Sequence, residues 1–260
     1  MPKRPPRYLG GYTVIMKTEI IAHRGASFDA PENTIAAIQL GWQQGADAVE
    51  IDVHFSKDGH VVVIHDDNTR KTSGVRRKVA AQTLAELKSL DVGSWKSAEF
   101  KGERIPTLAE ALATIPRGKR MFVEIKCGPE CIPSFAKDVR ASGLKPDQIV
   151  PIGFSLETMT LLKRAVPDLE VCWIVEFKRT LGGWSPSVGA LTEQVTKAGL
   201  DGLDVSGRGP VDADFTRQMR KAGQRLYIWT VDEPTRAREL MDAGVDGITT
   251  NKPGWLRSQL

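Results

Sequence analysis

The fold is decided by residues 19–66, which read EIIAHRGASFDAPENTIAAIQLGWQQGADAVEIDVHFSKDGHVVVIHD. The apolar run at 19–22 predicts a first β-strand, and apolar residues at helical spacing predict a helix over residues 34–44. Residues 47–55 predict a second strand, and an Asp-Gly turn signal leads from it into a third extended run at 60–64. This stretch therefore predicts a strand–helix–strand unit followed by one hairpin arm.

Two residues ahead of the first helix fit its amino-terminal end. Pro31 suits a first helical turn because its missing N–H would have no intrahelical partner there in any case. Glu32 suits the positive end of the helix dipole. We therefore expect Pro31 in the first turn and Glu32 at the positive end of the helix.

The alternation of strand and helix resumes after residue 106. Further helices are predicted over residues 107–114, 132–141, 156–165, 188–198, 212–222 and 234–243. Further strands are predicted over residues 121–125, 148–152, 169–175, 202–205, 226–229 and 247–249. Repeated strand–helix units with apolar strands imply a parallel sheet covered by helices. About eight parallel strands favour a closed (β/α)8 TIM barrel, and the absence of Gly-x-Gly-x-x-Gly disfavours a dinucleotide-binding fold.

The chain is predicted to form one barrel domain over residues 19–260. Residues 1–18 are Pro- and Arg-rich, so we expect a disordered extension, and Met16 is an alternative start. Residues 67–106 break the rhythm after the hairpin arm, so we predict an insertion there with one short helix near residue 85. This insertion carries a run of basic residues, Arg70, Lys71, Arg76, Arg77 and Lys78, which is most simply a solvated surface.

Composition excludes several classes of protein. The 260 residues carry 36 basic and 32 acidic side chains, and this net charge of +4 is too small and dispersed to indicate nucleic-acid binding. No apolar run has the length of a signal peptide's core or of a membrane span, so we expect a cytoplasmic protein without a stable membrane anchor. Cys127, Cys131 and Cys172 do not form a disulfide or zinc pattern and are predicted to be reduced thiols.

Polar residues of related chemistry follow several early strands. In a TIM barrel, functional side chains stand at the carboxyl ends of the strands, so these residues are predicted to meet at one mouth. Glu50 and Asp52 are two apart on one strand and therefore share a face, roughly 7 Å apart along the strand. The residues expected at the mouth are His23, Arg24, Glu50, Asp52, His65, Glu124 and Lys126.

These residue types predict metal-assisted phosphate chemistry. Glu50, Asp52 and Glu124 offer hard oxygen ligands without cysteine, which favours Mg²⁺ or Ca²⁺, with Mn²⁺ as a further option. Such an ion, together with Arg24 and Lys126, would neutralise a phosphate and the charge that develops on it. His23 and His65 then remain as general acid and base, in either order, because a histidine titrates near neutrality.

Two further histidines lie in the hairpin. His54 is two residues beyond Asp52 on the same face, which would allow it to reach the mouth. His60 follows the Asp58-Gly59 turn and is predicted to be exposed. A role at the site is therefore weaker for His54 than for His23 and His65, and is not expected for His60.

The chain resembles a known family along most of its length. The motifs are His23-Arg24-Gly25, Pro31-Glu32-Asn33-Thr34, Glu50-x-Asp52, His65-Asp66, Glu124-x-Lys126, Phe154-Ser155, Trp229-Thr230-Val231 and Asp246-Gly247-Ile248-x-Thr250-Asn251-x-Pro253. They are similar to those of the bacterial-type, cytosolic glycerophosphodiester phosphodiesterases, a TIM-barrel family. This resemblance implies hydrolysis of glycerophosphodiesters to sn-glycerol 3-phosphate and an alcohol, either by direct attack of water or through a cyclic phosphate.

The resemblance also implies the roles of single residues. It implies His23 and His65 as the catalytic pair, Glu50, Asp52 and Glu124 as metal ligands, and Arg24 and Lys126 as phosphate contacts. Trp229 lies at a strand end, where it either packs on the glycerol carbons or belongs to the core. Asp232 stands where relatives often carry Asn, which puts the contacts of that loop in doubt. Residues 176–187, with Phe177 and Trp184, match no motif and form either an incidental surface loop or one side of the alcohol pocket.

Two alternative functions are compatible with the same residues. One is a related barrel phosphodiesterase that acts on lysophospholipids or phosphoinositol lipids, for which the basic insertion offers limited support. The other is a non-catalytic barrel that binds phosphate or metal. The second alternative is the weaker, because both candidate catalytic histidines are present.

Overall fold

The computed structural model describes residues 17–260, and in it eight parallel strands close into a barrel. The strands are β1 (Glu19–His23), β2 (Ala48–Phe55), β4 (Arg120–Ile125), β5 (Ile149–Gly153), β6 (Cys172–Val175), β9 (Gly202–Ser206), β10 (Arg225–Trp229) and β11 (Gly247–Thr250). Each pairs in parallel with its neighbours, and the pairing of β1 with both β2 and β11 closes the ring. The predicted TIM barrel is therefore confirmed.

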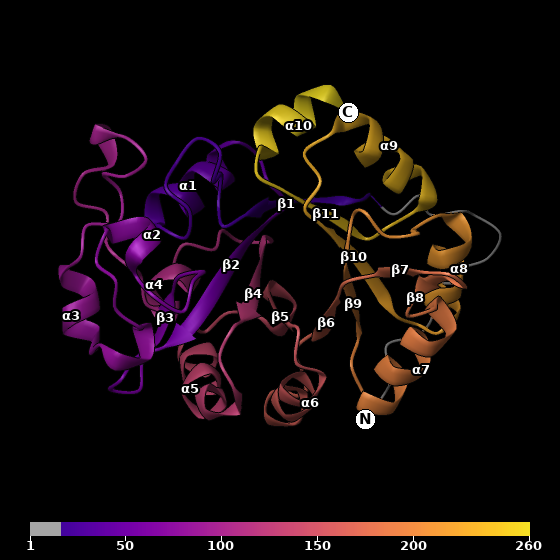
Figure 1. Ribbon diagram of the computed structural model, residues 1–260, viewed down its shortest axis with the longest axis horizontal. Coiled ribbons are helices and arrows are strands. Elements are labelled where there is room, and N and C mark those ends of the chain that lie inside the picture. Colours follow the sequence, from indigo (N-terminus) through magenta and orange to yellow (C-terminus); the bar gives the residue numbers. More distant parts are fainter. Residues whose placement is uncertain (1–16) are drawn as a thin grey trace.

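Helices cover the outside of the ring in chain order (Figure 1). They are α1 (Ile35–Gln43), α4 (Leu108–Leu112), α5 (Ile132–Ala141), α6 (Leu156–Ala165), α7 (Val188–Ala198), α8 (Ala213–Lys221), α9 (Pro234–Ala243) and α10 (Pro253–Gln259). Gly199 and Gly244 end α7 and α9 in the left-handed conformation, at φ 70° and 85°, which glycine adopts without strain. The helix α10 was not predicted from the sequence.

The start of α1 differs from the sequence expectation. The helix begins at Ile35, and the Thr34 hydroxyl caps it by accepting the Ala37 N–H at 3.2 Å. Asn33, immediately before the cap, has a left-handed φ of 61°, which a right-handed helix does not contain. Pro31 and Glu32 therefore lie ahead of the helix, and the assignment of Pro31 to its first turn was wrong.

The hairpin and the insertion follow β2. Strand β3 (Val61–Val63) runs antiparallel to β2, as the Asp-Gly turn signal predicted. Residues 67–106 then contain the short helices α2 (Arg70–Ser73) and α3 (Leu84–Ser89), which Figure 1 shows to one side of the barrel. A second hairpin, β7 (Lys178–Thr180) and β8 (Gly183–Ser185), occupies the loop that follows β6 and was not predicted. Of the expected N-terminal extension, residues 1–16 and hence Met16 lie outside the described residues.

Side chains from alternate strands fill the barrel interior in layers. At the amino ends of the strands, Arg120 pairs with Glu19 and with Glu170, each at 3.1 Å. Above this ionic layer Phe122 and Tyr227 meet edge to face, with ring centroids 4.8 Å apart. At the opposite end, the strand registers place His23, Glu124, Ile174 and Trp229 in one layer. The candidate site therefore stands on a packed core and opens only at the carboxyl ends of the strands.

Candidate active site

The predicted site residues meet at the carboxyl-terminal mouth of the barrel. His23 is the last residue of β1, and Glu50 and Asp52 point inward from β2. Glu124 lies beside Asp52 on β4, because the two residues are paired in the strand register. Lys126 directly follows β4, and His65 follows the hairpin arm β3. Strand order and register thus bring together residues that are up to about a hundred positions apart.

Three carboxylates form the centre of the site, and we call Glu50, Asp52 and Glu124 the carboxylate triad. One oxygen from each lies within 4.8 Å of the others, although the sequence spacing alone suggested about 7 Å between Glu50 and Asp52. The triad is nearly inaccessible, with relative exposures of 3%, 0% and 9%. Three buried acidic groups at this distance repel one another unless protons or cations neutralise them.

The protonation of the triad reflects this repulsion. Burial and the charges of Asp52 and Glu124 raise the pKa of Glu50 well above its usual value. Burial and the charge of Asp52 raise the pKa of Glu124 to about 7. Burial opposes the charge of Asp52 as well, but Arg24 and Lys126 hold the pKa of this carboxyl well below its usual range. One member of the triad is thus ionised, while the other two hold protons more tightly than ordinary carboxyls.

The donor set fits a hard divalent cation. All three ligands are carboxylate oxygens, the type preferred by Mg²⁺ and Ca²⁺. Glu50 Oε1 is buried and has no hydrogen-bond partner among the described residues. A buried carboxylate oxygen without a partner is costly, and a cation at the centre of the triad would satisfy it. The triad is therefore a candidate metal site, and the identity of the ion does not follow from its geometry.

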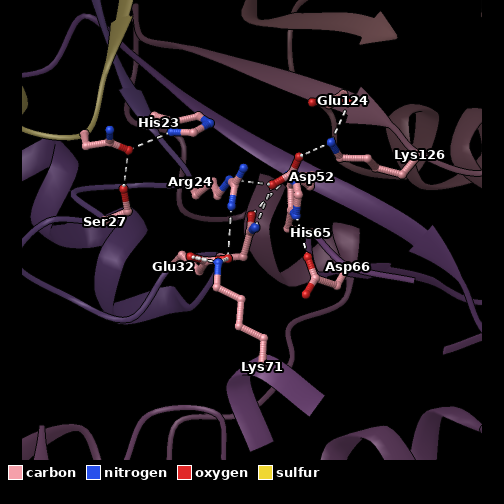
Figure 2. A network of polar contacts seen from close by, with 12 residues as sticks. His23, Arg24, Ser27, Glu32, Asp52, His65, Asp66, Lys71, Glu124 and Lys126 are labelled. Carbon is pink, nitrogen blue, oxygen red and sulfur yellow. Dashed lines mark hydrogen bonds and ion pairs between the residues drawn. The ribbon is translucent and has the colours of Figure 1, made fainter. Parts of the chain in front are cut away.

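Two cations flank the triad on opposite sides of Asp52 (Figure 2). Arg24 Nε lies 3.2 Å from Asp52 Oδ2, and Lys126 Nζ lies 3.2 Å from Asp52 Oδ1. Lys126 also lies 2.7 Å from Glu124 Oε1, and Arg24 Nη1 lies 3.1 Å from Glu32. Both cations therefore stand at the edge of the triad and partly neutralise its charge.

One residue of the basic run in the insertion, Lys71, contacts the site. Lys71 Nζ lies 2.7 Å from Glu32, the carboxylate that also binds Arg24. All five basic residues of the run are exposed, and Arg77 pairs with Glu86 at 2.7 Å. The charge run is thus a solvated surface, as expected, and Lys71 differs in that it also contacts Glu32.

The backbone after β1 is tightly constrained. Arg24 has a left-handed φ of 55°, and its N–H donates to Glu50 Oε2 at 2.9 Å. Gly25 has φ 79°, and a Cβ there would lie 2.4 Å from the Ala37 carbonyl carbon. Only glycine permits this approach between the loop and α1. The His-Arg-Gly motif therefore includes its glycine because the loop packs directly on a helix.

The two candidate catalytic histidines have different partners. His23 Nδ1 lies 2.7 Å from the Asn251 side-chain oxygen, and its Nε2 lies 4.0 Å from Glu50 Oε2. His65 Nδ1 lies 2.7 Å from Asp66 Oδ1. Burial and the charge of Arg24 lower the pKa of His23 to about 4. In both residues Nδ1 is engaged, which leaves Nε2 for other partners.

The remaining predicted residues lie further from the triad. His54 Nε2 lies 3.0 Å from the His65 carbonyl oxygen, so it supports the backbone of His65 and has no recorded contact with a carboxylate. His60 is exposed, as predicted. Trp229 is half-buried in the same layer as His23, and its Nε1 donates to the Asp204 carbonyl at 3.3 Å. Cys127, Cys131 and Cys172 are free thiols, as predicted.

Sequence reasoning missed the contribution of three polar residues around the site. The Asn33 amide donates to Asp52 Oδ2 at 2.8 Å, although the motif reading gave it no role. Asn251 is hydrogen-bonded to His23, and Asp232 is hydrogen-bonded to Asn251. In the sequence, each of these residues was marked only by its place in a motif. Its hydrogen-bond partner is defined by the closed barrel.

A fourth missed residue, Asp204, is an acidic group inside an apolar strand. It points into the barrel from β9, is 2% exposed, and its Oδ1 has no hydrogen-bond partner among the described residues. Burial and the charge of Glu124 raise its pKa well above the usual value. Asp204 is therefore a buried acid below the mouth that holds its proton more tightly than an ordinary carboxyl.

Comparison with known proteins identifies the family. Residues 23–255 match the model of the Glycerophosphoryl diester phosphodiesterase family, and this range includes every candidate site residue. The chain belongs to this family. It is therefore a phosphoric diester hydrolase, and the resemblance drawn from the motifs is confirmed.

Relatives in the family match over nearly their whole length. A glycerophosphodiester phosphodiesterase of Caldanaerobacter subterraneus is 33% identical, over 92% of this chain and 96% of that protein. A Bacillus subtilis glycerophosphodiester phosphodiesterase is 30% identical, over 90% of this chain and 83% of that protein. An Oleispira antarctica phosphodiesterase, solved in complex with the product sn-glycerol-3-phosphate, matches with a TM-score of 0.84 at 30% identity. That match covers 93% of this chain and 96% of the solved one.

Among residues 17–260, no helix has the length and apolar character needed to cross a bilayer. The predicted cytoplasmic location stays a prediction.

Proposed function

We propose that this enzyme hydrolyses glycerophosphodiesters to sn-glycerol 3-phosphate and an alcohol, with one divalent cation in the carboxylate triad and two histidines moving protons. The observation that carries the proposal is the triad itself, which offers one oxygen from each member within 4.8 Å of the others, with His23 Nε2 4.0 Å from Glu50 Oε2. The Oleispira antarctica relative was solved with sn-glycerol-3-phosphate, which supports the same product for this chain.

The triad would hold Mg²⁺ or Ca²⁺, with Mn²⁺ as a further option. When bound, the ion would polarise the phosphoryl group and offset the negative charge that develops on it. Glu50 would be a ligand through the oxygen that has no other partner, and Asp52 would enter already ionised. Glu124 would give up the proton that burial and Asp52 help it to retain.

Arg24 and Lys126 would bind the phosphate. Each already lies 3.2 Å from an Asp52 oxygen, so a phosphate at the edge of the triad is within reach of both side chains. Arginine offers a planar pair of donors to phosphate, whereas lysine offers a compact point charge. Trp229, in the layer of His23, is placed to pack against the glycerol carbons with its ring face.

His23 and His65 would divide the proton transfers. In each ring Nδ1 is engaged by a neighbouring residue, so Nε2 is the atom that accepts a proton from the nucleophile or gives one to the departing alkoxide. Their different partners, a neutral amide for His23 and a carboxylate for His65, give the two rings unequal charge stabilisation. Arg24 and Lys126 keep the phosphate between them throughout.

Turnover of glycerophosphocholine tests this proposal. We expect release of sn-glycerol 3-phosphate and choline, loss of turnover with EDTA, and recovery with Mg²⁺, Ca²⁺ or Mn²⁺. Full activity after exhaustive chelation would remove the metal from the proposal. Failure to hydrolyse any glycerophosphodiester, in protein that is folded and metal-loaded, would overturn it.

One observation favours the second candidate, hydrolysis of lysophospholipids. Three exposed aromatic side chains, Phe28, Trp95 and Trp255, lie next to the site. The ammonium groups of Lys96 and Lys252 lie over their rings. Lys252 Nζ lies 4.3 Å from the Phe28 ring and 5.3 Å from the Trp255 ring. Phe28 N–H also donates to the carbonyl of Asn251, whose side chain contacts His23. An apolar and basic rim of this kind suits a lipid with an anionic phosphate.

Comparing lysophosphatidylcholine with glycerophosphocholine separates the two candidates. The glycerophosphodiester proposal predicts the higher kcat/KM for glycerophosphocholine and little change in it when Phe28 and Trp255 are replaced by alanine. The lipid alternative predicts the reverse preference, and a rise in KM for lysophosphatidylcholine in the same double variant. A higher kcat/KM for the lipid would replace our first choice.

A further inference from the structure

A chain of hydrogen bonds reaches His23 from a residue on another strand end. Asp232, after β10, accepts from the Asn251 side-chain amide at 2.7 Å through Oδ2. Its Oδ1 accepts from the Asn251 N–H and from the Thr250 hydroxyl, both at 2.8 Å. The Asn251 oxygen in turn lies 2.7 Å from His23 Nδ1. One residue, Asn251, thus links His23 to a carboxylate that does not touch it.

Only one assignment of donors and acceptors satisfies every hydrogen bond along this chain. An ionised carboxylate only accepts hydrogen bonds, so the NH₂ group of Asn251 must face Asp232. Burial opposes the charge of Asp232, but the hydrogen bonds from Asn251 and Thr250 lower the pKa of its carboxyl. The amide oxygen of Asn251 then faces His23, which must supply the hydrogen. His23 Nδ1 therefore carries a proton and, in the neutral ring, Nε2 does not.

We infer that Asp232 is a positioning residue that fixes the tautomer of His23 through the side-chain amide of Asn251, so that substrate protons are exchanged only at Nε2. This inference rests on the proposed function, because it specifies the atom through which His23 would act. It assigns a purpose to Asp232, the residue at which this chain departs from the pattern often found in relatives.

The surroundings of Asn251 hold its side-chain amide in one orientation. Its Oδ1 accepts a second hydrogen bond, from the Ser27 hydroxyl at 3.1 Å, which also favours the orientation with the oxygen toward His23 (Figure 2). Its side chain and backbone both donate to Asp232, so the amide cannot rotate without breaking several bonds. His65, by contrast, is engaged directly by its sequence neighbour Asp66. Only His23 receives its orientation through an intermediate amide.

Replacing Asp232 by asparagine reverses the polarity of this chain. In Asp232→Asn the new amide still accepts from Thr250 through its oxygen, so its NH₂ group faces the NH₂ group of Asn251. Asn251 relieves this clash by turning its oxygen toward residue 232 and its NH₂ group toward His23. His23 Nδ1 must then accept, and the ring proton moves to Nε2. We expect kcat to fall at least tenfold, with KM changed less than threefold.

Restoring the polarity with a second change should restore the tautomer. In the double variant Asp232→Asn with Asn251→Asp, the new amide donates to the new carboxylate, which again accepts from His23 Nδ1. We expect kcat to recover to within about threefold of the wild type. Ser27→Ala is the matched control, since it removes one bond to Asn251 without reversing any donor, and should leave the tautomer unchanged.

The tautomer itself is measured by ¹⁵N-histidine NMR on the ion-free, substrate-free protein at pH 7.5, where His23 is neutral. His23→Gln assigns the signals. The inference requires that the His23 ring carries its proton on Nδ1 in the wild type and on Nε2 in Asp232→Asn. In the double variant Asp232→Asn with Asn251→Asp the proton must again be on Nδ1. Wild-type protein with an unprotonated Nδ1, or an unchanged tautomer in Asp232→Asn, would overturn it. Because the NMR measurement needs no turnover, it tests the inference independently of the proposed function.

Discussion

Asn33 and Asp52 are joined by two hydrogen bonds across the site. The Asn33 amide donates to Asp52 Oδ2 at 2.8 Å, and the Asp52 N–H donates to Asn33 Oδ1 at 3.0 Å. Asn33 can make both bonds because it adopts the left-handed conformation, with φ 61°, which asparagine tolerates better than most residues. It therefore orients the most buried carboxylate of the triad from outside the triad.

This relationship predicts that Asn33 controls metal affinity without being a ligand. Asn33→Gly keeps the left-handed backbone and removes the amide, and we expect the affinity for Mn²⁺ to fall by about 10- to 100-fold. Asn33→Ala should bind equally weakly and also lose thermal stability, because alanine is strained at this φ. Calorimetric titration and thermal unfolding measure the two effects. Wild-type affinity in Asn33→Gly would show that Asp52 needs no such support.

The proposed acid–base pair predicts a loss of turnover at two separate positions. His23→Ala and His65→Ala should each lower kcat for glycerophosphocholine by at least roughly 100-fold, because each removes one assisted proton transfer. Both variants should still fold and bind Mn²⁺, since neither histidine belongs to the triad. His60→Ala is the control, because His60 is exposed and should retain full activity. A variant with undiminished kcat would exclude its histidine from the proton transfers.

The sequence predicted the parts of this site that depend on local pattern. Strand ends and two-residue spacing were enough to bring Glu50, Asp52 and Glu124 to one mouth, because every strand of a TIM barrel ends on the same side. The link from Asp232 through Asn251 to His23 was not predicted. It joins positions up to 228 residues apart and depends on the closure of β11 against β1. Nothing in either segment alone specifies that contact.

The missed elements have similar causes. The left-handed φ of Asn33 places the Pro31-Glu32 pair outside α1, and a pattern of helix-start residues does not report this conformation. All three residues in each strand of the β7–β8 hairpin are exposed, so the hairpin carries no alternation of buried and exposed side chains. Asp204 lies in a strand that was predicted, but its lack of a partner is a property of the closed interior.

The protonation of the triad predicts that metal binding depends on pH. Burial and the charge of Asp52 raise the pKa of Glu124 to about 7, so a proton competes with the ion below this pH. We expect the affinity for Mg²⁺ to fall by about tenfold per pH unit between pH 7 and 6, with proton release on binding. Calorimetry in buffers of different ionisation enthalpy measures both. An affinity that is constant from pH 6 to 8 would contradict the protonated state of Glu124.

The glycine of the His-Arg-Gly motif predicts a large loss of stability. In Gly25→Ala the new Cβ would lie 2.4 Å from the Ala37 carbonyl carbon, so the loop or α1 must move. Gly45→Ala is a matched control, since Gly45 has a similar φ of 81° but its nearest neighbour would be 3.9 Å away. We expect Gly25→Ala to cost at least about 2 kcal/mol more than Gly45→Ala in urea unfolding. Equal costs would show that the loop is not held against the helix.

The buried acid of β9 predicts a variant that gains stability. Burial and Glu124 raise the pKa of Asp204 above its unfolded value, so its contribution to stability is present at low pH and is lost as pH rises toward the folded pKa. Asp204→Asn removes this loss, and at pH 8 we expect Tm to rise by about 2–4 °C. The control Asp201→Asn should lower Tm, because Asp201 pairs with Lys163 at 2.7 Å. The gain in Asp204→Asn should shrink toward pH 5, because the loss accumulates with each pH unit above the unfolded pKa and less of it has accumulated there. A gain that does not depend on pH would show that titration of this carboxyl is not its source.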